Sequence, residues 1–196
     1  MSKYWVLRNK KDNKGVYVDA IPNSGVANWK YSEGIPLKAD FNNDVKIYYS
    51  QNFPDGKQLY DFVSNILRVL IVSDKVKQLL QNESIENIEY LPLVVCDHKK
   101  NVVDDKYWLI NLIGGQDVID MEKSKYVMGS LNETQIKRIK KLVVNEYGVD
   151  GNPKLFRANA KRNLFFIHET IKNIFEKNNI TGYNVFEADG WDGFDF

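Results

Sequence analysis

The sequence has few of the residues on which common catalytic and metal sites depend. Its 196 residues include one cysteine, Cys96, and two histidines, His98 and His168. A single cysteine excludes an intramolecular disulfide and a multi-thiolate metal site, and two histidines cannot form a three-histidine zinc site. No His-Glu-x-x-His, Gly-x-Gly-x-x-Gly or Gly-Lys-Ser/Thr pattern is present. We therefore expect no metal site, no cofactor and no catalytic residues.

Long apolar runs and a net charge are also lacking. The longest apolar runs, such as residues 91–96 and 69–72, are far shorter than the roughly 20 residues of a membrane-spanning helix. Arg8 interrupts the apolar start too early for a secretion signal. The 27 Lys and Arg residues are balanced by 26 Asp and Glu residues, so no overall field attracts nucleic acid or a membrane surface. These absences predict a cytoplasmic protein without a membrane or nucleic-acid partner.

What the sequence does contain is typical of a folded domain. Hydrophobic residues make up 43% of the chain and charged residues 27%, close to the globular average and unlike a disordered chain. Residues 1–196 are long enough for one sizeable core. We predict a single domain, with residues 1–125 and 126–196 as its sub-lobes if it divides.

The N-terminal third predicts mainly strands and loops. Residues 4–7 favour a strand, and a turn signal then leads to residues 16–18 as its hairpin partner. Glycine, proline and asparagine punctuate residues 22–44, which favours irregular structure. Residues 45–49 favour another strand. Residues 59–66 place apolar side chains at helical spacing and predict a short helix.

The middle of the chain predicts a long hairpin. Residues 88–96 and 107–113 are rich in strand-forming residues and are separated by the polar residues 97–105. Residues 132–143 fit either a helix or a strand. The Gly114-Gly115 pair that follows the hairpin favours a tight turn or a strand bulge.

A weak internal repeat is the clearest sign of organisation. Residues 69–90 can be laid over residues 164–185 without a gap, and both copies predict strand, helix and strand. Asp74 and Glu169 fall at the two helix starts, where negative charge is favourable. Few residues are identical, so either duplication or one common pattern used twice explains the match. The predicted fold is α+β, with mixed or antiparallel sheets and a few short helices, arranged as two similar strand-helix-strand units.

Isolated reactive side chains give weak support for catalysis. Cys96 and His98 would share one face only if the strand continued to His98, and a buried free cysteine is the commoner arrangement. His168 lies at a predicted helix start, where a surface or capping role is the simpler interpretation.

Charged residues are unevenly distributed in the second half. The acidic run Asp117, Asp120 and Glu122 matches no calcium-loop spacing, so a solvated edge available for interaction is favoured over acid–base catalysis. Residues 137–162 contain two acids against eight bases, namely Lys137, Arg138, Lys140, Lys141, Lys154, Arg157, Lys161 and Arg162. Such a segment fits nucleic acid, an acidic partner or a solvated face.

The last fifteen residues have the opposite bias. They contain no base, and their acids alternate with aromatics as Phe186, Glu187, Asp189, Trp191, Asp192, Phe194, Asp195 and Phe196. Aromatic side chains are enriched in interface hot spots, and the acids would attract a basic partner. Folding of this tail onto the core of the protein is the equal alternative.

Four segments share their order and spacing with one known family. They are Lys3-Tyr4-Trp5-Val6-Leu7; Tyr107-Trp108-Leu109-Ile110-Asn111 with the following Asp117, Asp120, Glu122 and Ser124; Leu155-Phe156-Arg157; and Phe166-Ile167 with the helix that leads to Ile180-Thr181-Gly182-Tyr183. Together they resemble the α+β immunity-protein family of bacterial polymorphic toxin systems. The resemblance covers nearly the whole chain.

The resemblance implies a protein that binds and neutralises a cognate toxin encoded nearby, by contact and not by catalysis. The alternatives are a small enzyme that uses the acidic cluster and a nucleic-acid binder that uses residues 137–162. The residues predicted to contact the partner are Asp117, Asp120, Glu122, Glu187, Asp189, Trp191, Asp192, Phe194 and Asp195.

Overall fold

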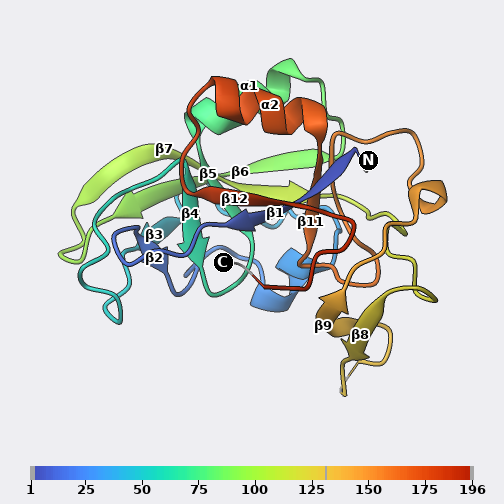
Figure 1. Ribbon diagram of the computed structural model, residues 1–196. Coiled ribbons are helices and arrows are strands. Elements are labelled where there is room, and N and C mark those ends of the chain that lie inside the picture. The colour runs from blue at the N-terminus through green and yellow to red at the C-terminus, as the bar shows by residue number, and fades with distance from the viewer. Residues whose placement is uncertain (1–2, 131, 195–196) are drawn as a thin grey trace.

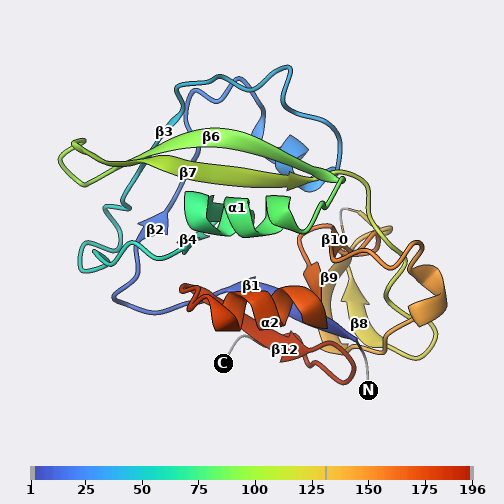
Figure 2. The ribbon, with the colours of Figure 1, turned by 90° about the horizontal axis from the view of Figure 1, so that it is seen from above.

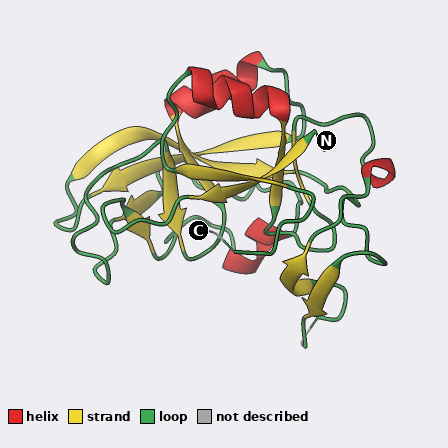
Figure 3. Cartoon of the chain, viewed as in Figure 1, coloured by secondary structure: helices red, strands yellow, loops and turns green. Residues whose placement is uncertain are grey.

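The fold is built from strands, with two short α-helices packed together on one side (Figures 1 and 3). The computed structural model describes residues 3–130 and 132–194. The strands are β1 (Tyr4–Asn9), β2 (Tyr17–Val18), β3 (Lys46–Tyr48), β4 (Phe62–Asn65), β5 (Leu70–Ser73), β6 (Ile88–Cys96), β7 (Val102–Leu112), β8 (Lys125–Met128), β9 (Ile136–Lys141), β10 (Leu155–Arg157), β11 (Phe165–His168) and β12 (Tyr183–Glu187). The helices are α1 (Asp74–Asn82) and α2 (Glu169–Lys177), with short 3-10 turns at Asn28–Ser32 and Glu146–Gly148. The predicted α+β class is confirmed.

The strands form three sheets. A four-stranded antiparallel sheet has the order β10-β11-β1-β12. A six-stranded sheet has the order β2-β4-β5-β7-β6-β3, in which β2 and β3 are parallel to their neighbours and the other pairs are antiparallel. The third sheet is the β8-β9 pair. Because β1 pairs with β11 and β12, strand pairing does not follow a division at residue 125.

The two larger sheets repeat one arrangement with the same register. In the first, β7 lies between β5 and β6 and pairs Ile110 with Leu70. In the second, β1 lies between β11 and β12 and pairs Leu7 with Phe165. Leu70 and Phe165 are 95 residues apart, which is the offset of the repeat found in the sequence. The agreement favours duplication over a common pattern used twice.

The central strands of the two units also share a sequence. Tyr107-Trp108 of β7 occupies the same register position as Tyr4-Trp5 of β1. In each unit a helix lysine lies over the tryptophan ring, at 3.2 Å for Lys77 on Trp108 and 4.7 Å for Lys172 on Trp5. The bonding of the two tryptophans differs: Trp108 Nε1 donates to Asp74 at 3.0 Å, whereas Trp5 Nε1 has no partner among the described residues.

A single apolar core joins the two units. Side chains from β5, β7, β1, β11 and the inner faces of both helices meet in it. Figure 2 shows α1 and α2 as neighbours. Its fully buried members include Val76 and Leu80 of α1 and Ile171 and Phe175 of α2. Two further cores cover the outer faces of the sheets, one under the loops of residues 16–49 and the other under β8, β9 and the tail. The central strands are therefore buried on both faces, which explains their nearly continuous apolar sequences.

Two local predictions are wrong. Residues 16–18 do not form a hairpin with β1, because both edges of β1 are occupied by β11 and β12, and β2 instead runs parallel to β4. Residues 62–65 form a strand and not a helix. The Phe62 side chain packs in the core between the two sheets, and the Val63 side chain packs in the core under the loops of residues 16–49. The apolar residues therefore lie on both faces of a strand and not on one face of a helix.

Other predictions are confirmed. Strands β1 and β3 and the irregular 22–44 region lie where expected, and the long β6-β7 hairpin forms, although β7 begins at Val102, inside the predicted connection. The ambiguous 132–143 region contains the strand β9, which exposes its lysines and buries Ile136 and Ile139. Neither described α-helix has the length and apolar character needed to cross a membrane.

The shared core makes α1 sensitive to truncation of its inner side chains. We expect Leu80→Ala to lower the free energy of unfolding by about 2–5 kcal/mol, because Leu80 is fully buried and leaves a cavity. Lys75→Ala on the exposed side of the same helix should change it by less than about 0.5 kcal/mol. Denaturant titration of both variants checks this expectation, and equal effects would contradict it.

Candidate functional site

Two acidic segments lie side by side next to the core under β8, β9 and the tail, which we call the third core. Residues 117–122 carry three acids and residues 145–150 carry two, and neither segment contains a base. Backbone hydrogen bonds from Asp117 N to Gly148 O, 3.0 Å, and from Asn145 N to Val118 O, 2.8 Å, hold them together. We call residues 117–122 and 145–150 the acidic face. Gly148 permits the close approach, because a Cβ there would lie 2.3 Å from Asp117 O.

Three of the predicted partner-binding acids belong to this face but have different roles. Asp120 caps its own turn: its Oδ1 accepts from the backbone of Glu122 and Lys123, and its Oδ2 accepts from Lys123 Nζ at 2.9 Å. The Lys123 ammonium holds the pKa of the Asp120 carboxyl below its usual value. Asp117 accepts a 2.8 Å bond from Asn159 and remains exposed, as does Glu122. Asp120 therefore shapes the face, while Asp117 and Glu122 present charge to solvent.

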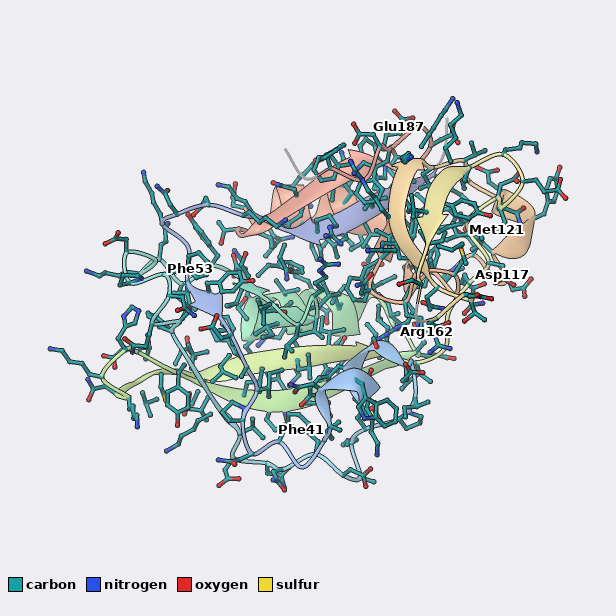
Figure 4. The ribbon with its side chains drawn as sticks, turned by 90° about the horizontal axis from the view of Figure 1, so that it is seen from below. Phe41, Phe53, Asp117, Met121, Arg162 and Glu187 are labelled. Carbon is teal, nitrogen blue, oxygen red and sulfur yellow. The ribbon has the colours of Figure 1, made fainter. Side chains whose placement is uncertain are left out.

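Exposed apolar side chains accompany these acids. Tyr147 is fully exposed, and Met121 is 37% exposed. A hollow of about 360 Å³ lies between the segments and is lined by Asp117, Ile119, Asp120, Met121, Glu122, Asn145 and Ala160. Figure 4 shows Asp117 and Met121 close together on one side of the molecule. The sequence did not single out Tyr147 or Met121, because their exposure depends on how the two segments pack.

The acidic tail reaches the same region from the other side of residues 142–145. Val144 N donates to Asp189 Oδ1 at 3.1 Å. Gly190 N donates to Leu142 O, and Leu142 N donates to Trp191 O, each at 2.8 Å. On the other side of this segment, Asp120 N donates to Val143 O at 2.9 Å. The fold thus brings together two acidic groups that are about 70 residues apart in the sequence.

The tail is partly core and partly surface. Trp191 is 7% exposed and packs in the third core with Ala188, so its ring fixes the tail in place. The side chains of Glu187, Asp189 and Asp192 are exposed, and Phe194 is 42% exposed with the Arg138 guanidinium 5.0 Å from its ring. Asp195 lies outside the described residues.

The basic 137–162 segment does not form one surface. Lys154 pairs with Glu83 at 2.7 Å, and Arg162 pairs with Glu33. Arg157 is 2% exposed, and burial lowers its pKa to about 10. The bases of β9 remain exposed. Lys161 donates to the carbonyls of Ile136 and Lys137, each at 3.1 Å. Half of the eight bases are therefore engaged within the protein, which weakens the nucleic-acid alternative.

The remaining reactive side chains occupy structural positions. Cys96 is fully buried and ends β6, and His98 beyond the strand bonds to the Ser50 carbonyl at 3.1 Å. Because β6 ends at Cys96, His98 does not share a strand face with Cys96. His168 caps α2 by accepting from Thr170 N at 3.1 Å, and burial lowers its pKa. Across residues 3–130 and 132–194, no three His, Cys, Asp or Glu side chains are grouped to hold a metal ion.

Comparison of the chain with known protein families identifies the family to which it belongs. The model of the immunity protein family (Imm11) matches residues 3–189, which is nearly the whole chain. The chain therefore belongs to this immunity protein family, and the resemblance seen in the sequence is confirmed. No curated protein matches the chain.

The position of Trp191 determines how the tail responds to mutation. We expect Trp191→Ala to lower the free energy of unfolding by about 3–5 kcal/mol, as for other buried aromatics. Phe194→Ala, three residues further on, should cost less than about 1 kcal/mol because its ring is substantially exposed. Thermal unfolding of the pair separates the two roles, and a small loss for Trp191→Ala would contradict the assignment of this ring to the core.

Proposed function

We propose that this protein neutralises a cognate toxin by binding it directly, with the acidic face as its contact surface. Membership of the immunity family supports a toxin as the partner. The observation that carries the choice of surface is the convergence of two base-free acidic segments around the fully exposed Tyr147. The partner is then a toxin with a basic surface, encoded beside this protein and bound in the cytoplasm of the producing cell.

The composition of the acidic face suits recognition by a protein. Exposed carboxylates accelerate association with a basic partner through long-range attraction. Exposed aromatic and methionine side chains supply apolar contact area with little loss of backbone freedom, since both segments are fixed by hydrogen bonds. Glu187, Asp189 and Asp192 extend the negative charge beside the face. Binding of this kind blocks a toxin by covering its functional surface and requires no chemical step.

Charge reversal tests the electrostatic part of this proposal. We expect Glu122→Lys with Glu146→Lys to slow association with the inactivated toxin by about tenfold or more at low salt, with a smaller effect at high salt. The matched control is Asp44→Lys with Asp105→Lys, which changes the net charge equally at exposed positions outside the face. Association rates across a salt series measure the difference, and equal slowing by both pairs would show that only net charge matters.

Removal of the exposed tyrosine tests the contact itself. We expect Tyr147→Ala to weaken the complex with the product of the adjacent gene by about tenfold or more, mainly through faster dissociation. The folding stability should hardly change, because the side chain is fully exposed. Co-purification and survival of the host cell provide the readout. Rescue of growth without a complex would instead indicate an enzymatic mechanism and would overturn the proposal.

A further inference from the structure

The strand β12 lies at an edge of the four-stranded sheet. It pairs with β1 in an unbroken register, and no described strand pairs with its other edge. Figure 2 shows β12 along the outer side of the molecule, with β1 and α2 on its inner side. An edge strand presents unpaired backbone groups to which another strand can add. The outer edge of β12 is therefore a candidate interaction surface.

The register determines which backbone groups of β12 face outward. On the β1 side, Lys10 N donates to Gly182 O at 2.8 Å. At the other end of the strand, Ala188 N donates to Tyr4 O at 3.3 Å. Backbone groups alternate between the two sides of a strand, so every second residue between these two bonds also faces β1. The residues that face outward are Tyr183, Val185 and Glu187.

The other edge strands are protected against pairing with a further strand. Strands β2, β3 and β10 have only two or three residues. The β8-β9 pair carries lysines and register shifts. Short strands, lysines and bulges are the usual features that prevent pairing at an edge. In contrast, β12 has five residues without a lysine, a proline or a register shift.

The equivalent edge in the first unit is closed. The 95-residue offset equates Tyr90 of β6 with Val185 of β12, and the pairing of the two strands agrees with it. Strand β3 pairs with Val94–Cys96 on the outer edge of β6, and Pro92 in the middle of β6 has no N–H to donate. The residue of β12 equivalent to Pro92 is Glu187, and β3 has no counterpart beside β12 among the described strands. The second unit therefore leaves open an edge that the first unit covers.

We infer that β12 pairs with the β12 of a second copy of this chain, antiparallel and centred on Val185, so that the two four-stranded sheets become one. The outward-facing residues are symmetric about Val185, and an antiparallel copy therefore pairs the backbone groups of all three. Val185 then faces Val185, and both are β-branched residues that suit a strand. Glu187 faces the Tyr183 phenol and not a second carboxylate, so no like charges lie directly opposite each other. This pairing concerns the protein alone and does not rest on the proposed function.

Sedimentation of the full chain over a concentration series tests the pairing. We expect a wild-type dimer, and a dissociation constant raised by about tenfold or more in Val185→Lys and in Val185→Glu, because each variant opposes like charges across the symmetry axis. A one-to-one mixture of the two variants should dimerise again, since opposite charges then meet. Val127→Lys, at an exposed apolar position on β8, is the matched control and should dimerise like the wild type. A wild type that stays monomeric up to about 1 mM would overturn the inference.

A nitroxide label at Glu187→Cys tests the register without changing a buried position. Glu187 is exposed and Cys96 is fully buried, so labelling is directed to the introduced thiol. With Val185 opposite Val185, the two labelled positions are four residues apart along the paired strands, and their Cα atoms are about 15 Å apart. Spin–spin distance measurement checks this value, and a dimer with a much longer separation would contradict pairing through β12. A monomeric wild type whose toxin complex is weakened by Val185→Lys would also overturn self-pairing, and would assign the edge to a strand of the toxin.

Discussion

The burial of apolar side chains between the two larger sheets is the constraint on which the rest of the structure depends. This core takes side chains from both sheets and from both helices, and most of its members are almost completely buried. The strands β1, β5, β7 and β11 are buried on their other faces as well, so the two outer cores are attached to the central one through the same strands. The acidic face lies against one outer core, and the loops of residues 16–49 cover the other. The acidic face and these loops therefore depend on the packing of the same central core.

The local periodicity of the sequence predicts many of the helices and strands of this fold. The two strand-helix-strand units have the predicted helix starts, because an amphipathic helix after a short apolar strand is a strong pattern. The failures have different physical reasons. Residues 16–18 pair with the distant strand β4, and pairing between distant strands leaves no local signal. Residues 62–65 pair with the neighbouring strand β5, but a strand buried on both faces has apolar residues on both sides, and this spacing resembles that of a helix. The shared Tyr-Trp of β1 and β7 was visible in the sequence, but the 95-residue offset does not align these two strands.

The candidate surfaces were predictable only in part. The acidic run and the acidic tail stand out in the sequence, yet only the fold brings them to the two sides of residues 142–145. The tail was equally compatible with interface and core, and it divides between them: Trp191 is buried while neighbouring acids are exposed. The basic segment is misleading as a unit, because half of its bases are buried or bonded to other groups of the protein. Folding gathers acidic side chains into one face, although the chain as a whole is nearly neutral.

The position of β1 has a consequence for how the protein is made. In the second unit β1 occupies the place that β7 holds in the first, but it comes from the start of the chain and its partners come from the end. During synthesis β1 is made before β11 and β12, so neither edge of β1 can be paired until both later strands have been made. A chain that stops before β11 lacks the sheet that supports the acidic face. Translation interrupted at that point therefore yields no acidic face.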